Sequence, residues 1–150
     1  MKFIHSFRVR ASLEAVAAFH QDPGSMALIT PPPIIIRYQK APARLVDGAE
    51  INFTMWFGPL PIHWVARIEH VSVNGFLDQQ MHGPFASWTH RHTFTPIDDQ
   101  FTEVRDEVEV RLRRNLVWGL VGFGMWLGLP LLFAYRAWKT RRVIRNKYGI

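Results

Sequence analysis

The chain has 150 residues, of which 48% are hydrophobic and 20% are charged, a composition that indicates one folded domain and excludes an intrinsically disordered chain. It contains no cysteine, which excludes disulfide bonds and thiolate metal sites. The formal net charge is +6, yet residues 1–135 hold 12 basic and 12 acidic residues, so the whole excess lies in residues 136–150. Nucleic-acid-binding proteins spread basic side chains over a face of the fold, and we therefore expect no nucleic-acid partner.

The start of the chain predicts a strand followed by two short helices. Residues 2–10 alternate apolar and polar side chains, as in a strand with one buried face. Ser12 precedes the helix-forming segment 13–21 and can accept hydrogen bonds from the free amides of its first turn. A second short helix is expected within residues 25–30, because prolines lie on both sides of it. No apolar run here is long enough for a signal-peptide core, so we expect a cytoplasmic location.

Six further strands are predicted between residues 34 and 112. Each alternates β-branched or aromatic residues with polar ones, and turn-forming residues separate them, with Asn74-Gly75 as the strongest hairpin signal. The segments are residues 34–40, 50–57, 62–73, 76–82, 87–95 and 101–112. Together with the first strand they predict a seven-stranded antiparallel sheet in a single α+β domain spanning residues 1–150. The apolar face of this sheet needs a cover, and the C-terminal segment is long enough to supply it.

The C-terminal segment combines an apolar stretch with a basic tail. Residues 116–135 carry no charge and are long enough to span a bilayer. Their glycines and Pro130 weaken a helix, so a helix that begins only near Pro130 is an alternative. Spanning a membrane, dipping into its surface and covering the sheet all stay open, so the protein is cytoplasmic, peripheral to a membrane or anchored in it. The tail can contact an anionic membrane surface through Arg136, Lys139, Arg141, Arg142, Arg145 and Lys147.

The sequence GPFASWTHRHTF at 83–94 places aromatic and histidine side chains on one face of a strand. These residues alternate, so Trp88, His90, His92 and Phe94 point to the same side. The next strand has an inner face that carries Asp106 among valines and threonine. If the hairpin closes around residues 96–100, His90 faces Asp106. A charge on an apolar face needs a partner, so we expect a hydrogen-bonded pair that holds the structure or anchors a ligand, with acid–base catalysis as the alternative.

Metal and nucleotide sites lack support in the sequence. His90-x-His92 could supply two ligands, with His5, His63, His82 or Asp106 as a third. However, the chain has no HExxH motif and no second HxH pair, so we expect no metal and no cofactor. It also has no GxGxxG, Walker-type or GxSxG motif, which leaves nucleotide binding and serine hydrolysis without a sequence signal.

Six segments in order along the whole chain carry a family resemblance. They are LITPPP at 28–33, Ile62-x-Trp64, FLDQQMHGPF at 76–85, Trp88-x-His90-x-His92-x-Phe94, Thr102-x-Val104-x-Asp106-x-Val108 and Phe133-Ala134-Tyr135-Arg136. Together they resemble the bacterial polyketide cyclase/dehydrase-like branch of the SRPBCC, or START-like, superfamily. The resemblance implies the helix-grip fold, in which a seven-stranded antiparallel sheet wraps around a long C-terminal helix and two short helices follow the first strand.

The resemblance also implies a cavity that takes apolar molecules, in which only some relatives perform chemistry. The matched positions Asp78, Gln80, Trp88, His90 and Asp106 bring no known role with them. Residues 116–132 depart from the family pattern, because relatives have a shorter and more polar stretch here. This departure favours contact with a membrane.

We therefore predict a protein that binds, and in one version transports, a hydrophobic or amphipathic small molecule or lipid between sheet and helix. The predicted ligand-binding residues are Phe53, Met55, Phe57, Trp64, Trp88, His90, His92, Phe94 and Asp106. One alternative is a cyclase- or dehydrase-type enzyme with His90 as general acid–base and Asp106 as its partner. The other is a membrane-anchored lipid-handling protein.

Overall fold

The computed structural model describes residues 1–148, in which a seven-stranded antiparallel sheet carries three helices. Strand β1 (Lys2–Val9) is followed by helices α1 (Leu13–Gln21) and α2 (Gly24–Leu28), as predicted. The remaining elements are β2 (Ile34–Lys40), β3 (Glu50–Phe57), β4 (Leu60–Ser72), β5 (Gly75–His82), β6 (Ser87–Pro96), β7 (Thr102–Arg111) and α3 (Leu116–Tyr148). Residues 149–150, the end of the predicted basic tail, lie outside the described residues. This arrangement is the helix-grip fold.

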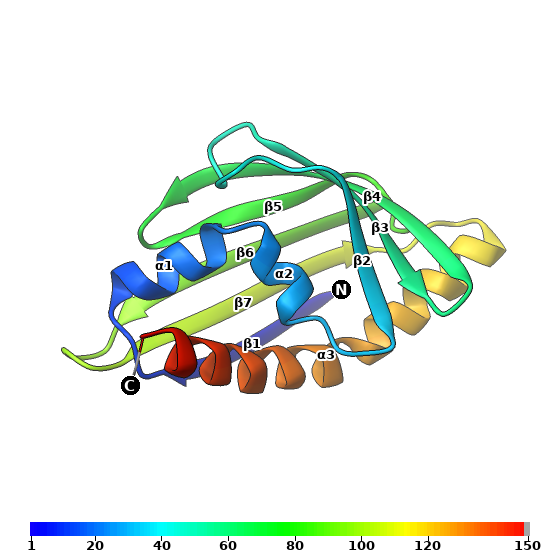
Figure 1. Cartoon of the computed structure of the whole chain (residues 1–150). Helices are drawn as coiled ribbons and strands as arrows, with labels where there is room; N and C mark the ends of the chain where they lie inside the picture. The colour runs from blue at the N-terminus through cyan, green and yellow to red at the C-terminus, as the bar shows by residue number, and fades with distance from the viewer. Residues whose placement is uncertain (149–150) are drawn as a thin grey trace.

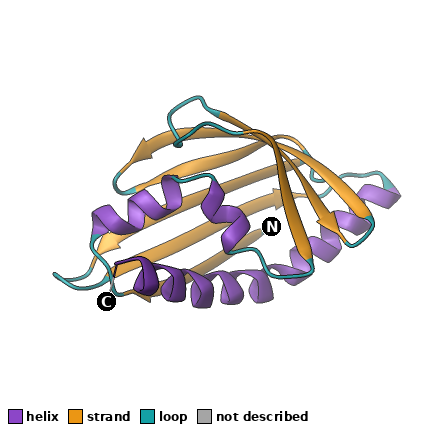
Figure 2. Cartoon of the chain, in the orientation of Figure 1, coloured by secondary structure: helices purple, strands orange, loops and turns teal. Residues whose placement is uncertain are grey.

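The sheet has the order β1-β7-β6-β5-β4-β3-β2, so the first strand pairs with the last. All three helices lie on one side of the sheet (Figure 2), and α3 lies along β1 (Figure 1). Ser12 caps α1 by accepting a hydrogen bond from the Ala15 amide at 3.2 Å, as expected. The face of the sheet toward the helices is the inner face, and its side chains form the core with those of α3.

The predicted register of the β6–β7 hairpin was wrong by two residues. His92, not His90, lies opposite Asp106, and His90 lies opposite Val108. The predicted pairing left Pro96 in the loop, whereas in the structure Pro96 pairs with Thr102 and extends β6 by one residue beyond the predicted end. A shift of two residues keeps every side chain on its predicted face, because side chains alternate with a period of two. The inner face was therefore identified correctly.

Helix α3 is continuous from Leu116 through Pro130, so the predicted alternative of a helix beginning near Pro130 was wrong. Asn115 caps its first turn, accepting hydrogen bonds from the amides of Val117 and Trp118 at 3.0 and 3.1 Å. Gly122 packs so closely on Phe85 and Leu112 that a Cβ there would press against both side chains. Tertiary packing of this face offsets the low helix propensity of the glycines. The buried residues of α3 are Gly122, Leu129, Phe133, Ala137, Thr140 and Ile144.

Gly75 brings β5 close to β6 beside the candidate site. Its φ is +140°, a backbone conformation that other residues rarely adopt. A Cβ at this position would overlap the carbonyl oxygen of His92. Glycine therefore allows β5 to pair with β6 in the register that sets Asp78 opposite His90.

Candidate functional site

Two neighbouring rungs of the sheet place polar side chains on its inner face. In one rung Asp78 of β5 lies opposite His90 of β6. In the next, His92 of β6 lies opposite Asp106 of β7, which in turn lies opposite His5 of β1. The side chains of His90 and His92 project from the same face of β6, and the centroids of their rings are 3.8 Å apart. The sheet thus gathers two carboxylates and three imidazoles at one place.

Asp106 accepts the N–H of His90. The His90 Nε2 atom donates to Asp106 Oδ1 at 2.9 Å, and both side chains are buried, with residue exposures of 3% and 5%. His92 Nδ1 lies 3.1 Å from the same oxygen, but outside hydrogen-bond geometry. Burial by itself would raise the pKa of Asp106, yet the hydrogen bond from His90 and the contact with His92 hold it well below its usual range. Asp106 is therefore a carboxylate that fixes the orientation of His90.

His20 of α1 and Asp78 complete the cluster. The His20 ring lies 4.7 Å from the Phe94 ring and 6.2 Å from that of His92, centroid to centroid, and its Nδ1 donates to the Val16 carbonyl at 2.9 Å. Burial lowers the pKa of His20 from 6.5 to about 4. Burial also raises the pKa of Asp78 to about 6, although His92 and Arg136 act in the opposite direction. At neutral pH, then, His20 is uncharged.

Arg136 of α3 points into the same region. Its Cζ lies 5.3 Å from the centroid of the Phe133 ring. Burial lowers the pKa of Arg136, and the carboxylates of Asp106 and Asp78 counteract this effect. From the sequence we grouped Arg136 with the membrane-contacting basic tail, but the structure places it between α3 and the sheet. It follows Phe133 by three residues, and residues at this spacing share a helix face.

Five buried polar atoms of the sheet and of α3 have no hydrogen-bond partner among the described residues. They are His5 Nδ1, Asp78 Oδ1, His92 Nδ1, Arg136 Nε and Thr140 Oγ1. Buried polar groups in folded proteins are nearly always paired, because an unpaired one costs about 1–3 kcal/mol. The concentration of such atoms between the sheet and α3 therefore marks a polar site rather than an ordinary core.

The predicted aromatic residues form a continuous row on the inner face next to this cluster. Phe53 stacks on Trp64 at 6.1 Å between centroids, Trp64 contacts Trp88 edge-on at 5.3 Å, and Trp88 contacts His90 at 6.2 Å. Met55 and Phe57 follow Phe53 at two-residue spacing and are partly buried. The row gives the polar cluster an apolar extension across β3, β4 and β6.

The position of His90 disfavours the predicted catalytic role. Trp88, His92 and Phe133 surround its ring, and its Nε2 is engaged by Asp106. A general acid–base must reach the substrate atom that gains or loses the proton. His92 and Asp78 retain accessible surface, so they are better placed for such a step than His90.

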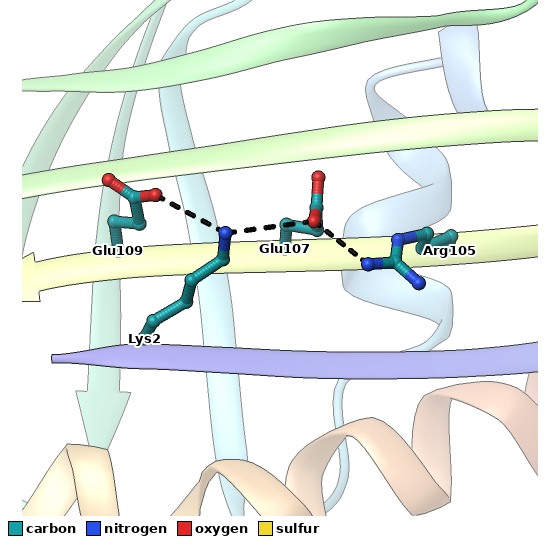
Figure 3. A network of polar contacts seen from close by, with 4 residues as sticks. All are labelled: Lys2, Arg105, Glu107 and Glu109. Carbon is teal, nitrogen blue, oxygen red and sulfur yellow. Dashed lines mark hydrogen bonds and ion pairs between the residues drawn. The ribbon is translucent and has the colours of Figure 1, made fainter.

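The outer face of the sheet has the character of a solvated surface. Lys2 contacts Glu109 and Glu107 at 3.7 and 3.9 Å, and Arg105 contacts Glu107 at 3.0 Å (Figure 3). Exposed ion pairs of this kind contribute about 0–1 kcal/mol to stability.

Two surface hollows lie away from the polar cluster. One of 520 Å³ lies beside Lys2 and Glu109, and one of 370 Å³ lies at residues 40–42 and 48–50. Buried aromatic side chains line the inner face.

Helix α3 exposes an apolar stripe on the side away from the sheet. Leu116 and Leu131 are 76% and 79% exposed, and Leu120 and Leu127 are exposed between them. Their spacings of four, seven and four residues place them on one helix face. The helix is long and apolar enough to cross a membrane by length and composition. The opposite side of the same helix packs on the sheet, so α3 both covers the sheet and presents an apolar surface.

The remaining basic residues of the tail lie outside. Arg142 and Lys139 lie against Trp138, while Arg145 and Lys147 are exposed in the last turns of α3. Arg141 is exposed, but its Nε donates to the Arg8 carbonyl at 2.8 Å, so it also ties α3 to β1. Arg142, Arg145 and Lys147 therefore form the accessible basic surface.

The sequence pattern places two members of the polar cluster, Asp78 and Arg136, on the inward side of their elements, but it does not place His20. Asp78 alternates with Phe76 and so shares its inner face, while Arg136 shares a helix face with Phe133. Gln80, the other matched position on β5, bonds both the amide and the carbonyl of Phe85 and fixes that loop. His20 lacked a signal, because the orientation of α1 against β6 depends on tertiary packing.

Comparison with solved structures identifies the same fold in proteins of very different sequence. A protein from Thermus thermophilus matches with a TM-score of 0.76 and 11% identity over 98% of this chain and 99% of its own. Norcoclaurine synthase from Thalictrum flavum matches with a TM-score of 0.73 and 13% identity over 99% of this chain and 96% of its own. The ZhuI aromatase/cyclase from Streptomyces sp. R1128 matches with a TM-score of 0.68 and 15% identity over 95% of both chains. No protein-family model matches the sequence, and no curated protein matches it.

These likenesses show the fold: the chain has the helix-grip fold that its resemblance to the SRPBCC, or START-like, superfamily implied. The resemblance found in the sequence motifs is thereby confirmed at the level of the fold. At identities of 11–15%, the function must be argued from the residues of the site.

The titration of His20 gives a test of the cluster that needs no ligand. The unfolded chain takes up the proton near pH 6.5, whereas the folded protein takes it up only near pH 4. Stability is therefore lost as the pH falls from 6.5 to 4, and His20→Phe should reduce this loss by up to about 3 kcal/mol. Urea unfolding at both pH values, with chelator present, measures it. His82→Phe, on the exposed outer face, should behave as the wild type; equal pH dependence in both variants would contradict the assignment.

Proposed function

We propose that the protein binds an amphipathic small molecule or lipid between the inner face of the sheet and α3. The observation that carries the proposal is the set of unpaired buried polar atoms, among them His5 Nδ1, Arg136 Nε and Thr140 Oγ1. The His5 ring and the Arg136 guanidinium both lie against Phe133, whose ring contacts His90 at the end of the aromatic row. A ligand could place its apolar part on the aromatic side chains and its polar end against these atoms. It would then supply the hydrogen bonds that the atoms lack. Pockets for small molecules combine an apolar lining with a few polar groups in this way.

Arg136 favours an acidic group on that ligand. Its guanidinium is the positive charge of the inner cluster that comes from α3, and Thr140 follows four residues later on the same helix face. A guanidinium pairs well with a carboxylate or another oxyanion. A norcoclaurine synthase of the same fold has been solved with dopamine and hydroxybenzaldehyde, which supports a small-molecule ligand for a protein of this fold.

A matched pair of fluorescent fatty-acid probes tests the proposal. The untagged protein should bind cis-parinaric acid, and Arg136→Met should weaken this binding at least tenfold while changing binding of the methyl ester little. Arg142→Met, which removes an exposed arginine from the same helix, should change neither. Absence of binding to the wild type, or equal effects of the two substitutions, would overturn the proposal. Native mass spectrometry of the purified protein would identify a ligand that remains bound.

The exposed stripe of α3 favours a second function, docking on an anionic membrane. Arg113 and Arg114 precede the stripe, and the accessible basic surface of Arg142, Arg145 and Lys147 follows it. Spanning a bilayer would require α3 to leave the sheet, whereas lying in the membrane surface uses only side chains that are already exposed. We therefore propose surface docking, which would bring the ligand site close to lipid.

The basic contribution to docking is measured with vesicles that contain phosphatidylserine. Each basic residue near an anionic surface contributes about 1 kcal/mol, so changing Arg142, Arg145 and Lys147 to glutamine should weaken vesicle binding by roughly two orders of magnitude. The effect should shrink in high salt. Unchanged binding of this triple variant would count against docking through the tail.

A further inference from the structure

The sheet brings a set of potential metal ligands together next to the proposed ligand site. One donor atom from each of Asp78, His90 and His92 can be chosen so that all three lie within 4.8 Å of one another. Asp78 lies directly opposite His90, and His92 is two residues further along the same strand. The donors thus come from two adjacent strands, which hold their backbones in fixed register.

From the sequence, His5, His63, His82 and Asp106 were the candidates for a third ligand beside the histidine pair, although we expected no metal. The structure places His63 and His82 on the outer face, with their ring centroids 5.2 Å apart, so neither can reach the inner pair. Asp78, which the sequence analysis did not consider as a ligand, supplies the third donor. Its Oδ1 is buried and has no hydrogen-bond partner among the described residues.

The chemistry of the three donors suits a divalent transition-metal ion. Two imidazoles and one carboxylate bind Zn²⁺, Co²⁺ or Fe²⁺ in many proteins and leave coordination positions open. An imidazole must be neutral to bind a metal. A cation would also compensate the buried carboxylate of Asp78, whose charge is otherwise costly.

Asp106 supplies an outer hydrogen bond to His90 and a close contact to His92. Its Oδ1 accepts from His90 Nε2 at 2.9 Å and lies 3.1 Å from His92 Nδ1. The other nitrogen of His90 is then free to bind a metal. Histidine ligands in metalloproteins commonly donate their second N–H to a carboxylate, which fixes the ring and increases its basicity.

We propose that Asp78, His90 and His92 bind a divalent transition-metal ion, with Asp106 as the positioning residue for the two imidazoles. Because all three ligands come from the sheet, the open positions of the ion face the helices. The ion and Arg136 then present positive charge to the same space, where an oxyanion of a ligand can lie.

Titration with Co²⁺ tests the site directly. The untagged, chelator-treated protein should bind one Co²⁺ per chain, with a visible absorption band that Zn²⁺ abolishes. Asp106→Asn should weaken binding by roughly 10–100-fold, as the loss of an outer hydrogen-bond partner does. Asp78→Asn and His92→Phe should weaken it further. The chain has no cysteine, so thiolate bands cannot confuse the spectrum.

The control is a variant in which His63 and His82 are both changed to alanine, because these residues form the other histidine pair. This variant should keep the bound ion. Absence of binding to the wild type, full binding by Asp78→Asn, or loss of the ion in the control would each overturn the proposal. Arg136→Met removes no metal ligand, so it should retain Co²⁺ even though it loses the acidic probe; the two proposals therefore fail separately.

Thermal unfolding provides a second readout if a variant is unstable. An ion that binds only the folded state raises the Tm as its concentration rises. Zn²⁺ should therefore raise the Tm of the wild type and of the His63/His82 control, but not that of His92→Phe. Equal increases in all three proteins would show that the ion binds elsewhere.

Discussion

Replacing Asp106 by alanine is expected to destabilise the protein by about 2–4 kcal/mol. The substitution leaves the buried Nε2–H of His90 without its acceptor and removes the carboxylate that the His92 ring contacts. It also takes away a negative charge that faces Arg136. Urea unfolding at neutral pH, with chelator present, measures the change in the free energy of unfolding. An alanine variant as stable as the wild type would contradict the structural role of Asp106.

The pH dependence of this effect has a defined sign. The pKa of Asp106 is lower in the folded protein than the value of 3.8 that it has when unfolded, so its contribution is present above that pH and is lost as the pH falls below it. The difference between wild type and variant should therefore shrink in acid. Glu109→Ala, on the exposed side of the same strand, is the matched control and should change stability by less than about 0.5 kcal/mol.

Changing Leu120, Leu127 and Leu131 together to serine is expected to abolish vesicle binding while leaving the fold intact. Burial of a leucine side chain in an apolar environment contributes about 1.5–3 kcal/mol, so the loss of three should weaken partition into anionic vesicles at least a thousandfold. Because these side chains are exposed in the protein alone, the substitutions remove few internal contacts. Co-sedimentation with vesicles measures binding, and the Tm reports stability.

The opposite face of α3 supplies the comparison for this prediction. Leu129 is buried against the sheet, so Leu129→Ser should lower the Tm, whereas each exposed leucine changed singly should not. If the triple variant unfolds, the stripe contributes to the core and not to a membrane surface. If it folds and still binds vesicles as the wild type does, docking does not use the stripe.

The fold followed from local patterns because those patterns and the tertiary packing agree. Strand alternation with a period of two, the hairpin at Asn74-Gly75 and the Ser12 cap all depend on neighbouring residues. The inner face was also predictable, since apolar alternation in β7 leaves Asp106 among valines. The register between β6 and β7 was not predictable from alternation. Two hairpins whose registers differ by two residues place the same side chains on the same face, so the pattern fits both.

The polar cluster contains contacts that local sequence patterns do not predict. His90 and Asp106 were expected to meet, and they do so on the diagonal of the hairpin and not directly across it. Arg136 was assigned to the basic tail by its position in the chain, but the rotation of α3 about its axis turns it inward. His20 reaches the site because α1 packs on β6, a contact that the composition of α1 leaves unspecified.

The sequence by itself determined the sheet, its inner face and the long apolar C-terminal segment, because these depend on periodicity and length. Only the tertiary structure decided that α3 is one continuous helix with one face on the sheet and an apolar stripe outside. It also decided that Asp78, His90, His92, Asp106 and Arg136 converge. The physical reason is that side chains distant in the chain meet through strand register and helix rotation, which are set by the packing of the whole core.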